Sequence, residues 1–375
     1  MAPATTRVAE LIVASSALLA VYRLAQRVTG RTEIAAATTL LTALYPVWFA
    51  QSTLAHADLM AAAFTLWGLV FYTENRSSAS DVGSKARARH RTKIVTAAAF
   101  FALAALSKET AICTPVALAA YEFWRALRVR GERAAALLNA LVLLGSVLPL
   151  CGWYVYHWRQ TGFVFGNPEF LRYNAEATLS PLRILLALFH RVLHLTAHVN
   201  LFVPVLCGLA SLLLLPRQLP DGSTRPSLPR ALVVPLLWML VANTLLFSVV
   251  GGALLTRYLL PLYPVVLLLC CATFWRRVPA WGGLVALSAF AFGLGLFFNP
   301  PYRFAPEDNL SYADAIQLDR QAIHQAVTRY PHETVLTAWP VSDELTKPEL
   351  GYMKWAIPVV AIDNFSLPEV QRAAA

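Results

Sequence analysis

Apolar residues run in long blocks along most of this chain, and short polar stretches separate the blocks. We count ten apolar segments, near 8–24, 34–50, 57–73, 94–107, 111–124, 134–156, 199–215, 231–250, 254–275 and 281–298. A helix needs about 20 residues to cross about 30 Å of hydrocarbon, and most of the segments approach that length. The pattern predicts an all-α polytopic membrane protein with about ten transmembrane helices.

The pattern changes after residue 298, where polar and charged residues become frequent. Residues 311–330 place apolar side chains at helical spacing. Two short runs, 334–339 and 357–362, read as strands. We therefore divide the chain into a transmembrane domain, 1–298, and a small α/β tail, 299–375, which is too short to be fully independent and should pack on the outer face of the membrane part.

Composition narrows the functional class. Hydrophobic residues make up 57% of the 375 positions and charged residues only 14%, with a mean hydropathy of +0.54. This balance excludes a soluble domain of this size. The net charge of +10 is spread over short clusters between apolar runs, so it indicates membrane topology and no nucleic-acid partner. All five cysteines fall in apolar runs, and we expect no disulfide.

Basic residues mark one side of the membrane. Eighteen of the 31 Lys and Arg residues lie in alternate connections, whereas the opposite connections hold only Lys108, Arg159 and Arg172. The positive-inside rule makes the basic side cytoplasmic. The stretch 75–93 is then a cytoplasmic basic linker, and both the N-terminus and the tail are extracytoplasmic.

Polar groups at the outer ends of segments are the best candidates for chemistry, because ionisable groups against a membrane are costly. Asp58 lies in AHADL (55–59), after His56, at the start of the third segment. An acid there favours the positive end of a helix; alternatively it orients a hydroxyl, binds a cation or accepts a proton.

Lys108 and Glu109 lie in ALSKETA (105–111), between two apolar runs of about fourteen residues. Such runs cover about 21 Å, which is less than the hydrocarbon thickness. The chain should therefore turn back below the outer surface and place both charges in a recessed pocket. Alternatively, the two charges pair with each other at the tip of a short hairpin.

Arg257 and Tyr258 open the motif RYLLPLYP (257–264), which begins an otherwise apolar span with a fixed cation. Arginine suits bidentate phosphate binding, and a lipid phosphate at the bilayer surface is the obvious partner. The alternative is a side chain that snorkels to the headgroups.

Residues 181–198 predict an amphipathic helix lying in the membrane interface. His190, His194 and His198 recur there at steps of four. All three together span about 12 Å and cannot share one metal ion. The pattern favours a stripe facing lipid headgroups over a metal site.

Taken in this order and on this side, AHADL, ALSKETA and RYLLPLYP resemble the GT-C superfamily of membrane glycosyltransferases. The resemblance covers most of residues 5–300 and is nearest to the aminoarabinose (lipid A) transferase-like and protein O-mannosyltransferase-like (family 39-like) branch. It implies a bacterial inner (plasma) membrane enzyme that moves a sugar from a polyprenyl-phosphate carrier to a hydroxyl on the outer side, typically with inversion.

The resemblance also assigns residues. Arg257, with Tyr258, would bind the carrier phosphate, and Lys108 would be a second cation beside it. Asp58 matches the second acidic position of the family, and with Glu109 it forms our expected catalytic pair. His56, His190 and His194 are secondary candidates.

The chain departs from the family at its start, since the first span and the first outer loop with its catalytic acid have no counterpart here. Three explanations are open: a sequence that begins late, which we favour, a non-catalytic relative, or Asp58 acting alone as base. No cofactor is indicated, and a divalent cation stays open. The alternative functions are a transporter or flippase for a lipid-linked substrate and a membrane scaffold. The sugar and the acceptor, whether lipid, glycan or protein, cannot be deduced from these residues.

Overall fold

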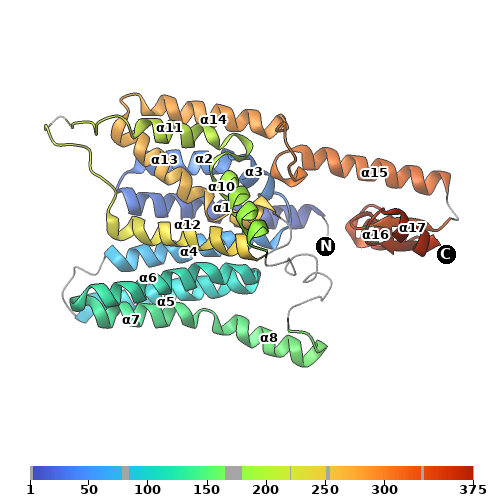
Figure 1. The fold of residues 1–375 in the computed structure, drawn as a ribbon, viewed down its shortest axis with the longest axis horizontal. Coiled ribbons are helices and arrows are strands. Elements are labelled where there is room, and N and C mark those ends of the chain that lie inside the picture. Colours follow the sequence, from blue (N-terminus) through green and yellow to red (C-terminus); the bar gives the residue numbers. More distant parts are fainter. Residues whose placement is uncertain are drawn as a thin grey trace. The chain divides into compact units, whose positions relative to one another are not determined.

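The computed structural model describes residues 3–77, 84–164, 180–219, 221–250, 254–330 and 333–374. Within them the chain forms two compact units, Glu10–Asn309 and a second one that joins Leu310–Ala375 to Met1–Ala9. Helices dominate the first unit, and Figure 1 shows its long helices running side by side.

Each of the ten predicted apolar segments contains a helix, so the all-α membrane fold is confirmed. The larger unit consists of the following elements in chain order: α1 (Pro3–Thr29), α2 (Thr32–Leu44), α3 (Pro46–Gln51), α4 (Ala57–Ser77), α5 (Ser84–Ser107), η2 (Glu109–Ile112), α6 (Cys113–Arg128), η3 (Arg130–Glu132), α7 (Arg133–Gly145), α8 (Leu148–Thr161), α10 (Pro181–Thr196), η4 (His198–Asn200), α11 (Phe202–Ser211), α12 (Arg230–Val249), η5 (Thr256–Leu259), α13 (Tyr263–Arg277), α14 (Trp281–Phe297) and η6 (Pro306–Asp308).

Four helical stretches of the described chain are long and apolar enough to cross a membrane by length and composition: Thr5–Thr29, Arg133–Thr161, Pro181–Asn200 and Arg230–Val249. Three of the shorter helices, α2, α11 and α14, are also apolar. Helix replaces part of the predicted linker, since α4 continues to Ser77 and α5 begins at Ser84. Alanine, lysine and arginine in this stretch favour helix; positions 78–83 lie outside the described residues.

The core of the larger unit is aromatic around the junction of α2 and α3. The Tyr45 ring lies 4.8 Å from that of Tyr263 and 5.2 Å from that of Phe292. Trp48 donates through Nε1 to the Leu260 carbonyl at 3.0 Å. These buried contacts fix α2, α3, α13 and α14 against one another, and so position the short turn η5 that precedes α13.

The smaller unit contains the predicted tail elements. α15 (Ser311–Arg329) occupies the expected helix, and β1 (Val335–Ala338) and β2 (Val359–Ile362) occupy the two expected strands. The strands are parallel, with Val335 opposite Val359. α16 (Val341–Thr346) and η7 (Pro348–Leu350) lie in the crossover between the strands, and α17 (Leu367–Ala374) ends the unit. The side of the membrane on which this tail lies stays a prediction.

Candidate functional site

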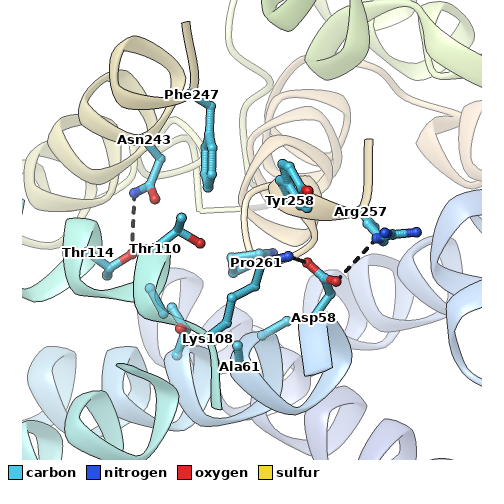
Figure 2. A pocket seen from close by; sticks show the side chains of 13 residues that line it. Asp58, Ala61, Lys108, Thr110, Thr114, Asn243, Phe247, Arg257, Tyr258 and Pro261 are labelled. Atoms are coloured by element: carbon cyan, nitrogen blue, oxygen red, sulfur yellow. Dashed lines mark hydrogen bonds and ion pairs between the residues drawn. The ribbon is translucent and has the colours of Figure 1, made fainter. Parts of the chain in front are cut away.

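Asp58, Lys108 and Arg257 lie together in one small cavity, although long stretches of sequence separate them (Figure 2). Lys108 donates through Nζ to Asp58 Oδ1, and Arg257 Nε lies 3.3 Å from Asp58 Oδ2. The Asp58 side chain is only 7% exposed. One buried carboxylate therefore holds both of the predicted phosphate-binding cations.

Local sequence explains why each group stands at the end of a helix. Asp58 occupies the first turn of α4, where the helix dipole favours an acid. Lys108 has extended backbone and interrupts the helical path between α5 and α6. Arg257 lies in η5 because Pro261 and Pro264, which lack a backbone N–H, prevent one continuous helix from forming there.

Glu307 is a fourth charged member of this site. Arg257 donates through Nη1 to Glu307 Oε1, and both side chains are 20% exposed. Gln51 Nε2 donates to the Glu307 carbonyl at 3.3 Å, while Gln51 Oε1 accepts from His56 Nδ1 at 2.8 Å. η6, α3 and the loop before α4 are thus tied together around Arg257.

Burial shifts the pKa values of three groups in these loops: His56, Lys108 and Glu307. It lowers the pKa of His56 to about 4, and the Arg257 charge adds to this effect, so the imidazole is neutral near pH 7. Because His56 Nδ1 donates to Gln51, its Nε2 carries the lone pair. Burial also lowers the pKa of the Lys108 ammonium against the opposing effect of Asp58, and raises the pKa of the Glu307 carboxyl against that of Arg257.

Aromatic side chains form one wall of the cavity. The Tyr258 ring stacks on Phe247 at 5.6 Å, and Lys108 Nζ lies 3.8 Å from the centre of the Tyr258 ring. Behind this wall lies Arg191 of α10, a residue that is 2% exposed. It donates through Nη1 to the Leu255 carbonyl at 2.8 Å. Asn243, one helical turn before Phe247 on α12, donates to Thr114 at 3.3 Å (Figure 2).

The cavity is closed by its own ion pairs. The space between the side chains is about 20 Å³, which is room for about one water molecule. Two cations, Lys108 and Arg257, face two carboxylates, Asp58 and Glu307. An anionic ligand must therefore separate these pairs and replace the carboxylates as partner of the cations.

A second, larger cavity of about 640 Å³ lies on the other side of η5 and η6. His190, His194, Tyr302 and Arg303 line it, together with apolar side chains. His194 Nδ1 is buried there without a hydrogen-bond partner in the described structure. His190 Nδ1 donates to the Leu186 carbonyl at 2.8 Å, which leaves its Nε2 as an acceptor.

A buried network joins the two cavities. His198 Nε2 donates to Asp308 Oδ2 at 3.0 Å, and Thr256 donates to Asp308 Oδ1. Tyr302 OH contacts His198 Nδ1 at 3.1 Å and accepts from the Val199 N–H at 3.1 Å. Val199 has φ 42°, which is strained for a β-branched residue. Consecutive residues thus serve both cavities: Thr256 pairs with Asp308, and the following Arg257 pairs with Glu307.

The structure brings some predicted residues together and separates others. Tyr258 joins Asp58, Lys108 and Arg257, and His56 lies in the loop beside them. Glu109, the first residue of η2, is exposed and is not among the residues that line the cavity. His190 and His194 line the second cavity instead. Among the described residues, no group of three or more His, Cys, Asp or Glu side chains is placed to hold a metal ion.

Glu307 and the buried Arg191 were missed in the sequence. Glu307 and Asp308 form an acidic pair close behind the last apolar segment, on the side where Lys108 and Arg257 were expected. This position in the sequence could have identified the acidic pair as a candidate part of the site. Arg191 fell on the polar face of a predicted interfacial helix, and only the packing of α10 against α12 shows that it is buried.

Solved structures share this fold, whereas no family model and no curated protein matches the sequence. ArnT from Cupriavidus metallidurans, solved bound to undecaprenyl phosphate, superposes with a TM-score of 0.62 at 14% identity, over 98% of this chain and 73% of that one. The Archaeoglobus fulgidus oligosaccharyltransferase, solved with Zn and sulfate, gives a TM-score of 0.47 at 17% identity, over 90% of this chain and 48% of that one. The likeness to ArnT shows the fold alone, and it agrees with the aminoarabinose transferase-like fold expected from the sequence.

Proposed function

We propose that this protein is a membrane glycosyltransferase that takes a sugar from a polyprenyl-phosphate carrier and transfers it to a hydroxyl acceptor on the outer side of the membrane. The observation that carries the proposal is the meeting of Lys108, Arg257 and Asp58 in one cavity at the ends of membrane helices. The ArnT structure, which shares the fold, was solved with undecaprenyl phosphate.

The carrier phosphate would replace Asp58 and Glu307 as the partner of the two cations. Lys108 and Arg257 then stabilise the negative charge that develops on the departing phosphate, in a site with little water. Binding of the donor phosphate would free the Asp58 carboxylate from its two ion pairs, so that it can face the acceptor hydroxyl.

The transfer is a single displacement. The acceptor oxygen attacks the anomeric carbon, the bond from that carbon to the phosphate oxygen breaks, and its electron pair leaves with the phosphate. Asp58 accepts the acceptor proton. Attack opposite to the leaving group inverts the anomeric configuration. His56 is the second candidate base, since it is neutral and its Nε2 carries a lone pair.

We assign the acceptor to the second cavity. It is far larger than the first, and its walls combine apolar side chains with His190, His194 and Arg303. Thr256 lines the second cavity, and the next residue in the chain, Arg257, lines the first. An acceptor in the second cavity would therefore lie close to a carrier phosphate bound by Arg257. The walls suit a lipid-linked acceptor with a polar, hydroxyl-bearing head.

The test measures the binding of undecaprenyl phosphate to the purified protein in detergent by native mass spectrometry. The variant Arg257→Gln removes a charged hydrogen-bonding partner of the phosphate. It should therefore weaken binding by about 30-fold or more. Arg159→Gln, which removes an exposed arginine from α8, serves as the matched control and should bind as the wild type does. Equal binding by Arg257→Gln would refute the phosphate site.

A second measurement separates an enzyme from a carrier protein. Release of free undecaprenyl phosphate from undecaprenyl-phosphoryl sugars, in the presence of membrane extract as a source of acceptor, reports bond cleavage. The wild type should release it and Asp58→Asn should not. Tight binding without any release would support the scaffold or transporter alternatives.

A further inference from the structure

A third cavity lies at the opposite end of the helix bundle. It has a volume of about 270 Å³ and is formed by the end of α1, the start of α2, the loop before α12 and the end of α13. α12 and α13 connect the two ends, since Asn243 and Pro261 line the site near Asp58 whereas Pro229 and Arg276 line this cavity. The basic connections place this end on the predicted cytoplasmic side.

Arginines surround this cavity. Arg27 and Arg276 line it, and Trp275 forms part of its wall. The guanidinium of Arg31 lies 5.0 Å from the centre of the Trp275 ring and that of Arg225 lies 4.6 Å from it. No acidic residue is among the lining residues, so positive charge accumulates without a carboxylate in the wall.

Backbone carbonyls, and not acids, hold two of these arginines. Arg225 donates through Nη1 to the Trp275 carbonyl, and Arg276 donates through Nε to the Arg225 carbonyl at 3.2 Å. The Arg225 N–H bonds the Arg217 carbonyl at 2.7 Å, which fixes the loop on the end of α13. Carbonyl partners orient a guanidinium without neutralising its charge. The Glu33 carboxylate attracts Arg225 but is not among the residues that line the cavity.

The Nε of Arg225 is buried and has no hydrogen-bond acceptor in the described structure. A buried, unsatisfied N–H of a charged group is costly, and native proteins rarely leave one. Arg225 does not line the cavity itself, but it contacts the lining residues Trp275 and Arg276, so its unused donor adjoins the positively charged wall. Both features favour an anionic acceptor. Ser227 and Thr29 add hydroxyl groups to the same wall.

We propose that this cavity binds the phosphodiester headgroup of an anionic phospholipid from the leaflet at the basic end of the bundle. A phosphodiester supplies two acceptor oxygens and one negative charge, which matches the fixed guanidinium groups. The cavity lies between α1, α2, α13 and the loop before α12, and its apolar lining residues Val28, Ile34 and Leu228 would contact the upper acyl chain. The bound lipid would clamp the loop before α12 to α13.

The experiment compares phosphatidylglycerol with phosphatidylcholine on the purified full-length protein. Native mass spectrometry counts retained lipid, and a thermal melt in mixed micelles measures stabilisation. The wild type should retain phosphatidylglycerol about tenfold better than phosphatidylcholine and melt higher with it. The double variant Arg225→Gln, Arg276→Gln should lose this preference, whereas Arg133→Gln, an exposed arginine at the start of α7 on the same end, should keep it.

Two further arms make the result decisive. Inorganic phosphate at millimolar concentration should not reproduce the effect. If it stabilises the wild type as well as phosphatidylglycerol does, the ligand is a soluble phosphate and the lipid assignment is wrong.

The single variant Arg276→Gln guards against misfolding of the double variant and should show a partial loss of the lipid preference. Equal retention of the two lipids by the wild type would overturn the proposal. Arg257→Gln should leave this preference intact, so the result is independent of the proposed transferase site.

Discussion

Glu307→Gln is expected to tighten the binding of undecaprenyl phosphate. In the free protein Arg257 is held between Asp58 and Glu307, and the closed cavity has room for about one water molecule. A phosphate that binds Arg257 competes with these two carboxylates for the guanidinium. Glutamine keeps the shape of the side chain and can still accept a hydrogen bond, but it competes for the guanidinium without a charge.

The magnitude follows from the environment of the pair. Both side chains are 20% exposed, so the pair is neither at the surface nor fully buried. Two unit charges in contact interact by about 4 kcal/mol at an effective dielectric constant of about 20, and desolvation and screening cancel most of this. The Glu307 carboxylate then opposes phosphate binding by a net free energy of about 1 kcal/mol. Removing this opposition corresponds to roughly five-fold tighter binding for the variant.

The assay is a titration of purified protein with undecaprenyl phosphate at pH 7, with Glu109→Gln as the matched control, because Glu109 is an exposed carboxyl on the same end of the bundle. The control should change affinity less than two-fold, since surface charges contribute about 0–1 kcal/mol. If Glu307→Gln weakens binding as strongly as Arg257→Gln does, Glu307 positions Arg257 for phosphate and does not compete with it. That result would refute the competition.

The pH dependence of binding tests independently whether the Glu307 charge opposes phosphate binding. Burial raises the pKa of Glu307 above its ordinary value, so this carboxyl gains its proton earlier than an exposed one as the pH falls from 7. Protonation removes the competing charge and favours phosphate binding, while protonation of the ligand itself, with a pKa near about 6, opposes it. The ligand contribution is common to both proteins. The affinity advantage of Glu307→Gln over the wild type should therefore shrink as the pH is lowered toward 5.

Three further predictions follow from the same structure. Asp58→Asn should reduce transfer by about 100-fold or more, the usual contribution of a general base, while undecaprenyl phosphate still binds in the native mass spectrum; unchanged transfer would move the base to His56. His194→Ala should raise the KM for the acceptor without changing carrier binding, because His194 lines the second cavity only, and a loss of carrier binding would contradict the assignment of two substrates to two cavities. Gly68→Ala should lower the free energy of unfolding by about 1–3 kcal/mol, the usual cost of overpacking, since a Cβ there would lie 2.6 Å from the Phe101 ring. The control Gly152→Ala has nothing within 4 Å of its Cβ, and a thermal melt compares the two.

The helices and the two strands of the tail were predictable because they depend on local patterns. Apolar runs long enough to approach the width of a membrane fix the number and type of the segments. The interruption of segment 254–275 before Tyr263 was not predicted, although Pro261 and Pro264 account for it. Positive charge on alternate connections predicts which end of each segment faces the cytoplasm. None of this requires knowledge of which helix packs on which.

The cations and the first carboxylate of the site were also predictable, for a related reason. A charge is tolerated at the end of a membrane helix only where it meets a partner, so charged ends on the same side converge. This reasoning selected Asp58, Lys108 and Arg257. It could not exclude Glu109, because neighbouring residues at a turn point in different directions and the backbone conformation at Lys108 decides which one faces the cavity.

The sequence by itself therefore determined an all-helical membrane protein with three of the four charged groups of its site on one side. Only the tertiary structure decided that Glu307 pairs with Arg257, that Arg191 lies buried behind Tyr258, and that His190 and His194 line a separate cavity. The physical reason is that each of these contacts joins elements that are distant in the chain. Their geometry depends on how α10, η5 and η6 pack, and local residue patterns carry no information about that packing.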